Sequence, residues 1–236
     1  MSEIKDKGLG ITHAPQCVGI IMDGNRRFAK AQGLPTLEGH RRGYEKMREV
    51  MNWAKEAGIS FVVVYAFSTE NWNRTEKEVS YLMGLFKLFL TKEVRDMRKE
   101  GVRVRCIGER GRFSAELREL MERAEQDTAS ETGPTLVVAL SYGGRAEILA
   151  AANAALAAGE KQLTERHFRE LMWSHDIPDP DLIIRTGGEM RLSGFLPWQS
   201  VYSELFFTKT YWPAFPKEEF LAILAEFGKR ERRMGK

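Results

Sequence analysis

Short runs of consecutive apolar residues alternate along this chain with longer stretches whose apolar positions recur every three or four residues. Four of the runs are rich in β-branched residues and have the length of strands buried on both faces. These four runs cover residues 17–22, 60–66, 102–107 and 135–141. Two further runs, at 181–186 and 204–208, show the same character less clearly, so the sequence predicts six strands.

The stretches between these strands have the spacing of helices that bury one face. They cover residues 40–57, 76–100, 113–131, 144–158, 164–174 and 216–228. Strands that alternate with helices indicate an α/β fold in which a mainly parallel sheet is covered by helices on both faces. We therefore expect one domain over residues 15–236, built on a six-stranded sheet, after a flexible N-terminal lead-in at 1–14.

The helix predicted at 76–100 is unusual because apolar residues surround most of its circumference. These residues are Leu82, Met83, Leu85, Phe86, Leu88, Phe89 and Leu90. A helix on the surface would show a narrower apolar stripe. Burial against the sheet together with a dimer contact is one explanation, and the lining of an elongated hydrophobic tunnel is the other.

Composition and charge narrow the functional classes. Hydrophobic residues make up 43% of the chain, which is enough for a full core. The 36 basic and 33 acidic residues leave a net charge of only +3, so nucleic acid is not expected as a partner. Cys17 and Cys106 form no CxxC pair and are expected to stay reduced. No apolar run approaches the ~20 residues of a spanning helix, which favours a soluble, cytoplasmic protein that can still touch a membrane surface.

Candidate chemistry lies where the predicted strands end, which is where ligands collect in parallel sheets. Asp23, Gly24, Asn25, Arg26 and Arg27 follow the first strand. Guanidinium groups and free N–H groups in the first turn of a helix favour an anion such as a diphosphate. A carboxylate in that place is either a helix N-cap or a ligand of Mg²⁺, which takes oxygen ligands together with substrate phosphates.

A second cluster follows the second strand. It contains Ser68, Thr69, Glu70, Asn71, Trp72 and Arg74. Thr75 and Glu78 then have the spacing of a capping box at the start of the next helix. Both interpretations are compatible, because Thr75 can cap the helix while the earlier side chains face a cleft.

A third cluster follows the fifth strand and contains Arg185, two glycines, Arg191 and Ser193. This segment has neither a Walker A loop nor a GxGxxG motif, so nucleotide binding has no support. The glycines allow the backbone to approach a small anion, and Arg185 can make bidentate contacts with phosphate oxygens. His40 belongs to no HExxH motif and to no set of zinc ligands, and on its own it is an ordinary helix residue.

Taken together, these clusters resemble the cis-prenyltransferases over nearly the whole chain. The resemblance rests on the motifs at residues 13–30, 39–43, 65–74, 141–145 and 181–189, followed by Arg191, Ser193, Trp198 and Glu204 and by a C-terminal Arg-x-Gly element at 233–235. It implies an enzyme that joins isopentenyl diphosphate to an allylic diphosphate, with farnesyl diphosphate expected, and that forms a new Z double bond. The implied product is undecaprenyl diphosphate, a carrier lipid for the cell wall, and the implied assembly is a homodimer.

The resemblance also implies roles for individual residues. Asp23 and Glu204 would bind Mg²⁺, and Asn71 with Ser68, alongside Asp23 and Asn25, would carry the catalysis. The allylic diphosphate would be held by Gly24, Asn25, Arg26, Arg27 and His40. Isopentenyl diphosphate would be bound by Arg185, Arg191, Leu192 and Ser193, and by Arg233 and Gly235 reaching into the neighbouring subunit. Phe28, Thr69, Glu70, Trp72 and Arg74 would shape the substrate pocket.

Two alternatives remain at this point. The first is an enzyme of the same family with a shorter product or an irregular coupling, because product length does not carry over where Ser141 and Ala146 depart from some relatives. Phe28 also departs from the Trp of many bacterial members, and Thr36 stands where several relatives place an arginine on the allylic diphosphate. The small Ala66 favours an open tunnel and a long product. The second alternative is a non-catalytic partner subunit of the same fold. The presence of Asp23 and of the arginines argues against it, because such subunits lose these groups.

Overall fold

The computed structural model describes residues 14–230 and contains all six predicted strands. They form one sheet in the order β3-β4-β2-β1-β5-β6, and every neighbouring pair is parallel. The strands are β1 (Cys17–Ile21), β2 (Phe61–Ser68), β3 (Arg103–Ile107), β4 (Thr135–Tyr142), β5 (Leu182–Arg185) and β6 (Glu204–Phe207). The predicted lead-in at 1–14 falls almost wholly outside the described residues.

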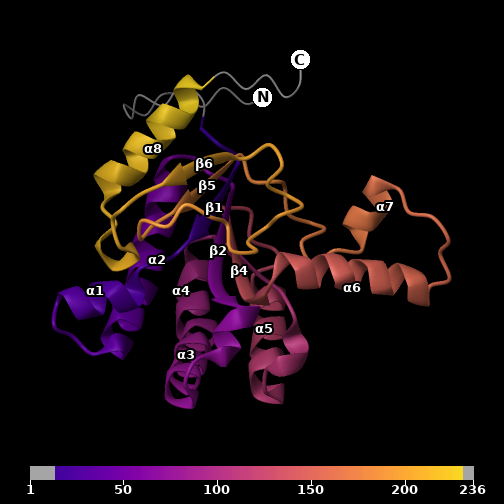
Figure 1. Cartoon of the computed structure of the whole chain (residues 1–236), viewed down its shortest axis with the longest axis horizontal. Coiled ribbons are helices and arrows are strands. Elements are labelled where there is room, and N and C mark those ends of the chain that lie inside the picture. Colours follow the sequence, from indigo (N-terminus) through magenta and orange to yellow (C-terminus); the bar gives the residue numbers. More distant parts are fainter. Residues whose placement is uncertain (1–13, 231–236) are drawn as a thin grey trace.

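Eight α-helices connect or flank the strands within the described part of the chain (Figure 1). They are α1 (Asn25–Ala31), α2 (Thr36–Glu56), α3 (Glu76–Leu88), α4 (Val94–Lys99), α5 (Ala115–Asp127), α6 (Gly144–Ala157), α7 (Glu165–Glu170) and α8 (Lys217–Lys229). The helix predicted from residue 40 begins four residues earlier, directly after Pro35, which ends the preceding turn. The predictions at 113–131 and 164–174 are too long at their ends.

The helix predicted at 76–100 is divided by a π-helical segment, Phe89–Glu93. The reason lies in its apolar pattern. Leu82 and Phe89 belong to one buried row, while Leu90, Val94 and Met97 belong to the next. The extra residue in a π turn shifts the helix phase so that both rows face the core. This helix is therefore covered on one broad side, as burial against the sheet requires.

The alternation of side chains along the strands separates two cores. Val18, Ile20, Val62 and Val64 pack with α2, α3, α5 and α8 on one face of the sheet. Cys17, Ile21 and Val63 point to the other face, where Phe195 and Trp173 cover them. All strands of the centre are buried on both faces, which explains why their sequences read as continuous apolar runs.

The sheet order places a switch point at β1. From β1 the chain proceeds to one side through β2 and β4, and β5 then pairs with the other side of β1. In open parallel sheets, ligand sites form where the order reverses in this way, at the carboxyl ends of the strands. The ends of β1, β2 and β5 carry the three clusters singled out in the sequence.

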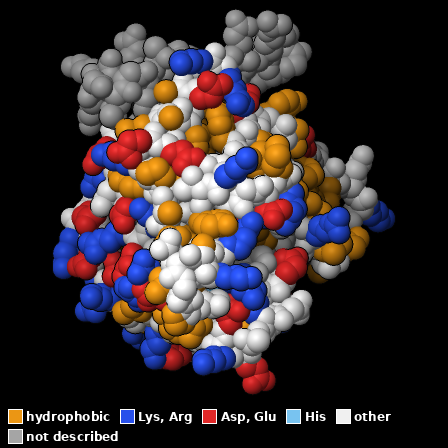
Figure 2. All heavy atoms as spheres, turned by 60° about the vertical axis from the view of Figure 1, so that its left-hand side comes forward, with side chains coloured by type: hydrophobic (Ala, Val, Ile, Leu, Met, Phe, Trp, Pro, Cys, Tyr) orange, Lys and Arg blue, Asp and Glu red, His pale blue; other side chains and the backbone are white. Residues whose placement is uncertain are grey.

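The surface agrees with the small net charge. Figure 2 shows basic and acidic side chains interspersed over the face in view, without a large area of one sign. Within residues 14–230, none of the helices has the length and apolar character needed to cross a bilayer.

Candidate active site

Asp23 lies directly beyond β1, and its backbone is held from two sides. Its carbonyl oxygen accepts hydrogen bonds from the Thr186 hydroxyl at 2.7 Å and from the Trp212 backbone N–H at 3.0 Å. Gly24 follows with a φ of 107°, and a Cβ there would lie 2.8 Å from the Tyr211 ring. A side chain at this position would therefore be both strained and blocked, which leaves the turn from β1 into α1 to glycine.

The Asp23 carboxylate pairs with two arginines that are far apart in the sequence, Arg27 and Arg185. Arg185 at the end of β5 donates to Oδ2 at 2.9 Å, and Arg27 on α1 lies 3.1 Å from Oδ1. Burial alone would raise the pKa of Asp23, but the hydrogen bonds and charges of Arg185 and Arg27 outweigh burial and lower its pKa. The carboxylate is therefore ionised at neutral pH, as a metal ligand must be.

The segment after β5 brings a second set of cations to the same edge. Arg185 also donates to the Ser193 hydroxyl at 2.8 Å and to the Arg191 carbonyl oxygen. Glu189 accepts from Arg191 and from Arg27, the latter at 3.4 Å. Arg185 is almost fully buried, so it organises this segment, while the exposed Arg191 remains open to a ligand.

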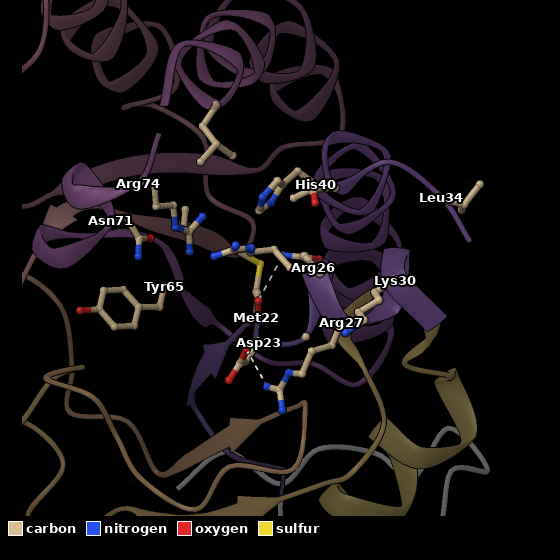
Figure 3. Close-up of a pocket in the computed structure, with 15 residues that line it drawn as sticks. Met22, Asp23, Arg26, Arg27, Lys30, Leu34, His40, Tyr65, Asn71 and Arg74 are labelled. Carbon is tan, nitrogen blue, oxygen red and sulfur yellow. Dashed lines mark hydrogen bonds and ion pairs between the residues drawn. The ribbon is translucent and has the colours of Figure 1, made fainter. Parts of the chain in front are cut away.

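A cavity of about 710 Å³ opens beside Asp23, and cationic side chains converge on it (Figure 3). Arg26 from α1 and Arg74 from the segment after β2 point toward one another across it, with His40 from α2 nearby. Within residues 14–230, no carboxylate lies within ion-pairing distance of the Arg26 guanidinium. Two guanidinium groups that face one another in a partly closed space favour an anion between them.

His40 and Glu78 form a buried pair between α2 and α3. His40 Nε2 lies 3.0 Å from Glu78 Oε1, and the same oxygen accepts from Arg74 at 3.1 Å. The capping box expected at Thr75 is thus only half formed, because Thr75 accepts from the Glu78 N–H while the Glu78 carboxylate turns to His40 and Arg74. The sequence predicted Glu78 only as part of a helix capping box. In the structure it belongs to the site, because it binds His40 and Arg74.

Burial lowers the pKa of His40, with the charges of Arg74 and Arg26 acting in the same direction and the Glu78 carboxylate opposing them. The folded protein therefore binds fewer protons at this site than the unfolded chain. We expect the free energy of unfolding to fall as the pH drops through about 6.5, where an unfolded histidine titrates. Urea unfolding at several pH values between about 7.5 and 5 tests this.

In the variant His40→Gln this part of the pH dependence is expected to disappear, because glutamine does not titrate in that range. The matched control is His175→Gln, on the surface after α7. Equal pH profiles for the wild-type chain and His40→Gln would contradict the prediction.

The segment Thr69–Asn73 is a 3-10 turn with a capping box of its own. The Ser68 side chain accepts from the Asn71 N–H, and the Asn71 side-chain oxygen accepts from the Ser68 N–H at 3.2 Å. Asn71 lines the cavity (Figure 3), whereas Trp72 packs between Phe67 and Phe113. Thr69 contacts Gly143, where a Cβ would lie 2.7 Å from the Thr69 hydroxyl, and Glu70 is exposed.

A smaller apolar cavity of about 70 Å³ continues from the polar one, between α2, α3 and the sheet. Met22, Asn25, His40, Ala66 and Leu82 line both. Deeper in, the walls are Tyr44, Met47, Leu85, Phe86, Phe89 and Val138. The structure thus shows a narrow apolar space between α2, α3 and the sheet, with Leu82, Leu85 and Phe86 of α3 in its wall. The elongated tunnel expected from the sequence stays a prediction.

Several expected site residues lie apart from this centre. Glu204 is the first residue of β6 and is level with Leu182, three residues before Arg185, so about 10 Å of strand separates it from the site's edge. Its carboxylate pairs with Arg230 at 2.6 Å.

Two further expected residues also lie away from the cavity. Phe28 lies under Arg42, whose guanidinium is 5.7 Å from the ring, and Leu192 packs against the second core. Arg233 and Gly235 lie outside the described residues.

Comparisons with known proteins agree with this geometry. The profile of the undecaprenyl diphosphate synthase family, Prenyltransf, matches residues 21–235. The chain belongs to this family. An isoprenyl transferase of Thermotoga maritima is 47% identical over 94% of this chain and 97% of its own, and one of Neisseria gonorrhoeae is 45% identical over 95% and 91%. The chain is therefore a cis-prenyltransferase, an enzyme of cis-prenyl diphosphate synthesis.

Two solved structures of this family are similar in fold as well. One is a lavandulyl diphosphate synthase from Lavandula x intermedia in complex with dimethylallyl diphosphate, with a TM-score of 0.89 and 31% identity over 94% of this chain and 99% of that one. The other is a probable undecaprenyl diphosphate synthase from Campylobacter jejuni, with a TM-score of 0.81 and 32% identity over 95% and 100%. The single α/β domain with six parallel strands is the fold predicted from the sequence.

Proposed function

We propose that this cis-prenyltransferase joins isopentenyl diphosphate to an allylic diphosphate, farnesyl diphosphate, in the Z configuration, and that repeated additions give a long polyprenyl diphosphate of the undecaprenyl type. The observation that carries the proposal is the continuity of two cavities of opposite character. The first is lined by Arg26, Arg74 and His40, and the second is apolar. Such a pair of spaces suits a molecule with a diphosphate at one end and a hydrocarbon chain at the other.

The allylic diphosphate is placed against Arg26, Arg74 and the N-terminal turn of α1. When its C–O bond ionises, negative charge develops on the leaving diphosphate. Side chains already fixed around the cavity stabilise that charge without reorganising, which lowers the barrier. Arg74 is fixed by Glu78, and Glu78 by His40, so this cation is held in place before the substrate arrives.

Mg²⁺ is proposed as the cofactor, with Asp23 as the protein ligand. Among the described residues no group of three or more acidic, histidine or cysteine side chains could hold a metal alone. A single ionised carboxylate beside a diphosphate site nevertheless fits Mg²⁺, which is commonly bound by one or two carboxylates, substrate phosphates and water. The ion would neutralise charge on the leaving diphosphate. Glu204 would join it only from a different chain or after a rearrangement.

Isopentenyl diphosphate is placed on the opposite side of Asp23, against Arg191 and Ser193. Its alkene would then face the end of β2, where Asn71 and Ser68 lie. Attack of the alkene on the allylic carbon creates a cationic centre, and the loss of a C2 proton completes the new double bond. That proton is acidic because of the adjacent cation, so a weak base suffices, and the proton would pass to the side-chain amide oxygen of Asn71 or to an oxygen of the departed diphosphate.

The direct test is incubation of the purified chain with labelled isopentenyl diphosphate, farnesyl diphosphate and Mg²⁺, followed by sizing of the extracted polyprenols. A ladder ending near eleven isoprene units is expected. Products of only three or four units would replace the long-chain assignment with a short-chain one. Irregular coupling is tested by a second incubation with dimethylallyl diphosphate alone, the compound bound in the structure of the lavender relative. A branched product there would indicate that type of coupling. If no condensation product forms, the chain would be assigned instead as a non-catalytic partner subunit of the same fold.

Ala66 is expected to control product length, because it lines both the polar and the apolar cavity. In Ala66→Leu three additional carbon atoms would enter the narrow space beside Leu82. We expect the main product to shorten by several isoprene units while the first condensation remains within about threefold of the wild-type rate. The same sizing assay decides this, and a product of unchanged length would contradict the role.

We also infer that two copies of the chain associate. Leu149 and Leu156 lie seven residues apart on the same side of α6, and they are 62% and 70% exposed. Figure 1 shows α6 and α7 extending from one side of the molecule. An exposed apolar row on a helix of this kind is typical of an interface. Contact of the enzyme with a membrane is proposed only through its lipid product.

A further inference from the structure

The 3-10 turn that carries Asn71 also carries Trp72. Its indole is enclosed by three neighbours: the Phe67 ring at 4.9 Å, the Phe113 ring at 5.3 Å, and the Arg112 guanidinium at 4.8 Å above the ring. Trp72 is not among the side chains that line the two cavities. The half-buried ring thus packs against the domain beside the turn.

The polar edge of this indole has one specific partner. Trp72 Nε1 donates to the Ser141 hydroxyl at 2.9 Å. Ser141 belongs to β4, 69 residues further along the chain, and its side chain is completely buried. The buried Ser141 hydroxyl and the indole N–H of the half-buried Trp72 satisfy one another, so this hydrogen bond favours one position of the indole.

The backbone of Ser141 is itself unusual. Its φ is 49°, in the left-handed region that a residue with a side chain seldom adopts. Its carbonyl oxygen accepts from the Glu109 N–H at 3.2 Å, and its neighbour Tyr142 offers a carbonyl oxygen to the Tyr65 hydroxyl at 3.1 Å. The end of β4 is therefore tied to β2 and to the segment that follows β3, and it presents the Ser141 hydroxyl at a defined position.

We propose that Ser141 is a positioning residue of the prenyl transfer reaction: its hydroxyl fixes the Trp72 indole, and the fixed indole holds the 3-10 turn that presents Asn71 to the cavity. This inference deepens the proposed function and rests on it for the activity measurements. No bond to a substrate is assigned to Ser141. Its effect passes through Trp72 to a residue that lines the pocket.

Two variants remove the hydrogen bond from its two ends. Ser141→Gly deletes the hydroxyl and accommodates the left-handed φ without strain. Trp72→Phe keeps an aromatic ring between Phe67 and Phe113 but lacks the N–H. We expect each variant to lower kcat by about five- to tenfold, with KM for the allylic diphosphate within about twofold of the wild-type value. Because both remove the same bond, the double variant should be no slower than the slower single variant.

Thr128→Val is the matched control, because Thr128 is an equally buried hydroxyl at the C-terminal end of α5, where it accepts from the Val104 N–H and donates to the Ala124 carbonyl oxygen. It should lower the melting temperature without changing kcat. A purely structural role for Ser141 predicts that Ser141→Gly behaves in the same way, with a lower melting temperature and an unchanged kcat. That result, or effects of the two single variants that multiply in the double variant, would overturn the proposal.

A measurement without substrate separates this inference from the proposed function. Backbone hydrogen exchange at residues 69–73 should become about tenfold faster in Ser141→Gly and stay unchanged in Thr128→Val. If exchange there does not change, Ser141 does not hold the turn, whatever the chain catalyses. If exchange changes as expected but the wild-type chain forms no prenyl product, the proposed function fails while the anchoring of Trp72 by Ser141 stands.

Discussion

Replacing Asp23 with alanine is expected to lower kcat by about a thousandfold while the sheet remains folded. The Asp23 carboxylate pairs with both Arg27 and Arg185, and so it joins the cationic segments that follow β1 and β5. Its loss would remove the proposed metal ligand and the partner of Arg185 at the same time. Steady-state kinetics with isopentenyl and farnesyl diphosphates is the measurement.

Asp23→Asn separates these two effects. The amide oxygen can still accept from the nearly buried Arg185, so the loss of stability should be smaller than in Asp23→Ala, but the charge that a metal requires is gone. We expect a loss of kcat close to that of the alanine variant. The control is Asp96→Ala, which removes a surface carboxylate paired with Lys99 on α4. Near-normal turnover in Asp23→Asn would show that the negative charge is not required and would remove Asp23 from the proposed metal site.

Gly39→Ala is expected to produce the largest loss of stability among single methyl additions in α2. A Cβ at position 39 would lie 2.1 Å from the Asn25 carbonyl oxygen and 3.0 Å from the Ala29 Cβ. Backbone atoms of α1 cannot yield as a flexible side chain does, so α1 and α2 must move apart. We expect the free energy of unfolding to fall by about 2 kcal/mol or more. Activity should fall too, because α1 carries Arg26 and Arg27.

Gly84→Ala is the matched control, since Gly84 is also inside a helix but a Cβ there meets nothing within 4 Å. Alanine should stabilise that exposed helix position by up to about 1 kcal/mol. Urea unfolding and kcat, measured on both variants, decide the comparison. Equal stability and equal kcat in Gly39→Ala and Gly84→Ala would contradict this prediction. The close packing of α1 on α2 would then not be needed to position Arg26 and Arg27.

The six strands could be predicted because each central strand is buried on both faces and so carries an uninterrupted apolar run. Helix ends were less accurate, and the π segment at Phe89–Glu93 was missed. The reason is physical: the extra residue serves the packing of two buried rows against the sheet, a tertiary requirement that periodicity within the helix does not express. The short helix at Asn25–Ala31 was expected only as the first turn of a helix after the first strand.

The site was predictable to the extent that strand ends share an edge. That rule brought Asp23 and Arg185 together, 162 residues apart, and the structure joins them directly. It could not identify Glu78 or Glu189, because their partners depend on how α2, α3 and the segment after β5 fold onto one another. Glu204, expected near the metal from resemblance alone, lies at the opposite end of its strand in this chain, where it pairs with Arg230.

The most direct measurement for the account as a whole is a crystal structure of the chain with Mg²⁺, isopentenyl diphosphate and an unreactive thiolo analogue of farnesyl diphosphate. The account predicts one diphosphate between Arg26 and Arg74, the other against Arg191 and Ser193, the metal on Asp23 and the hydrocarbon chain entering the space beside Ala66. Both diphosphates bound elsewhere, with this cavity empty, would contradict it.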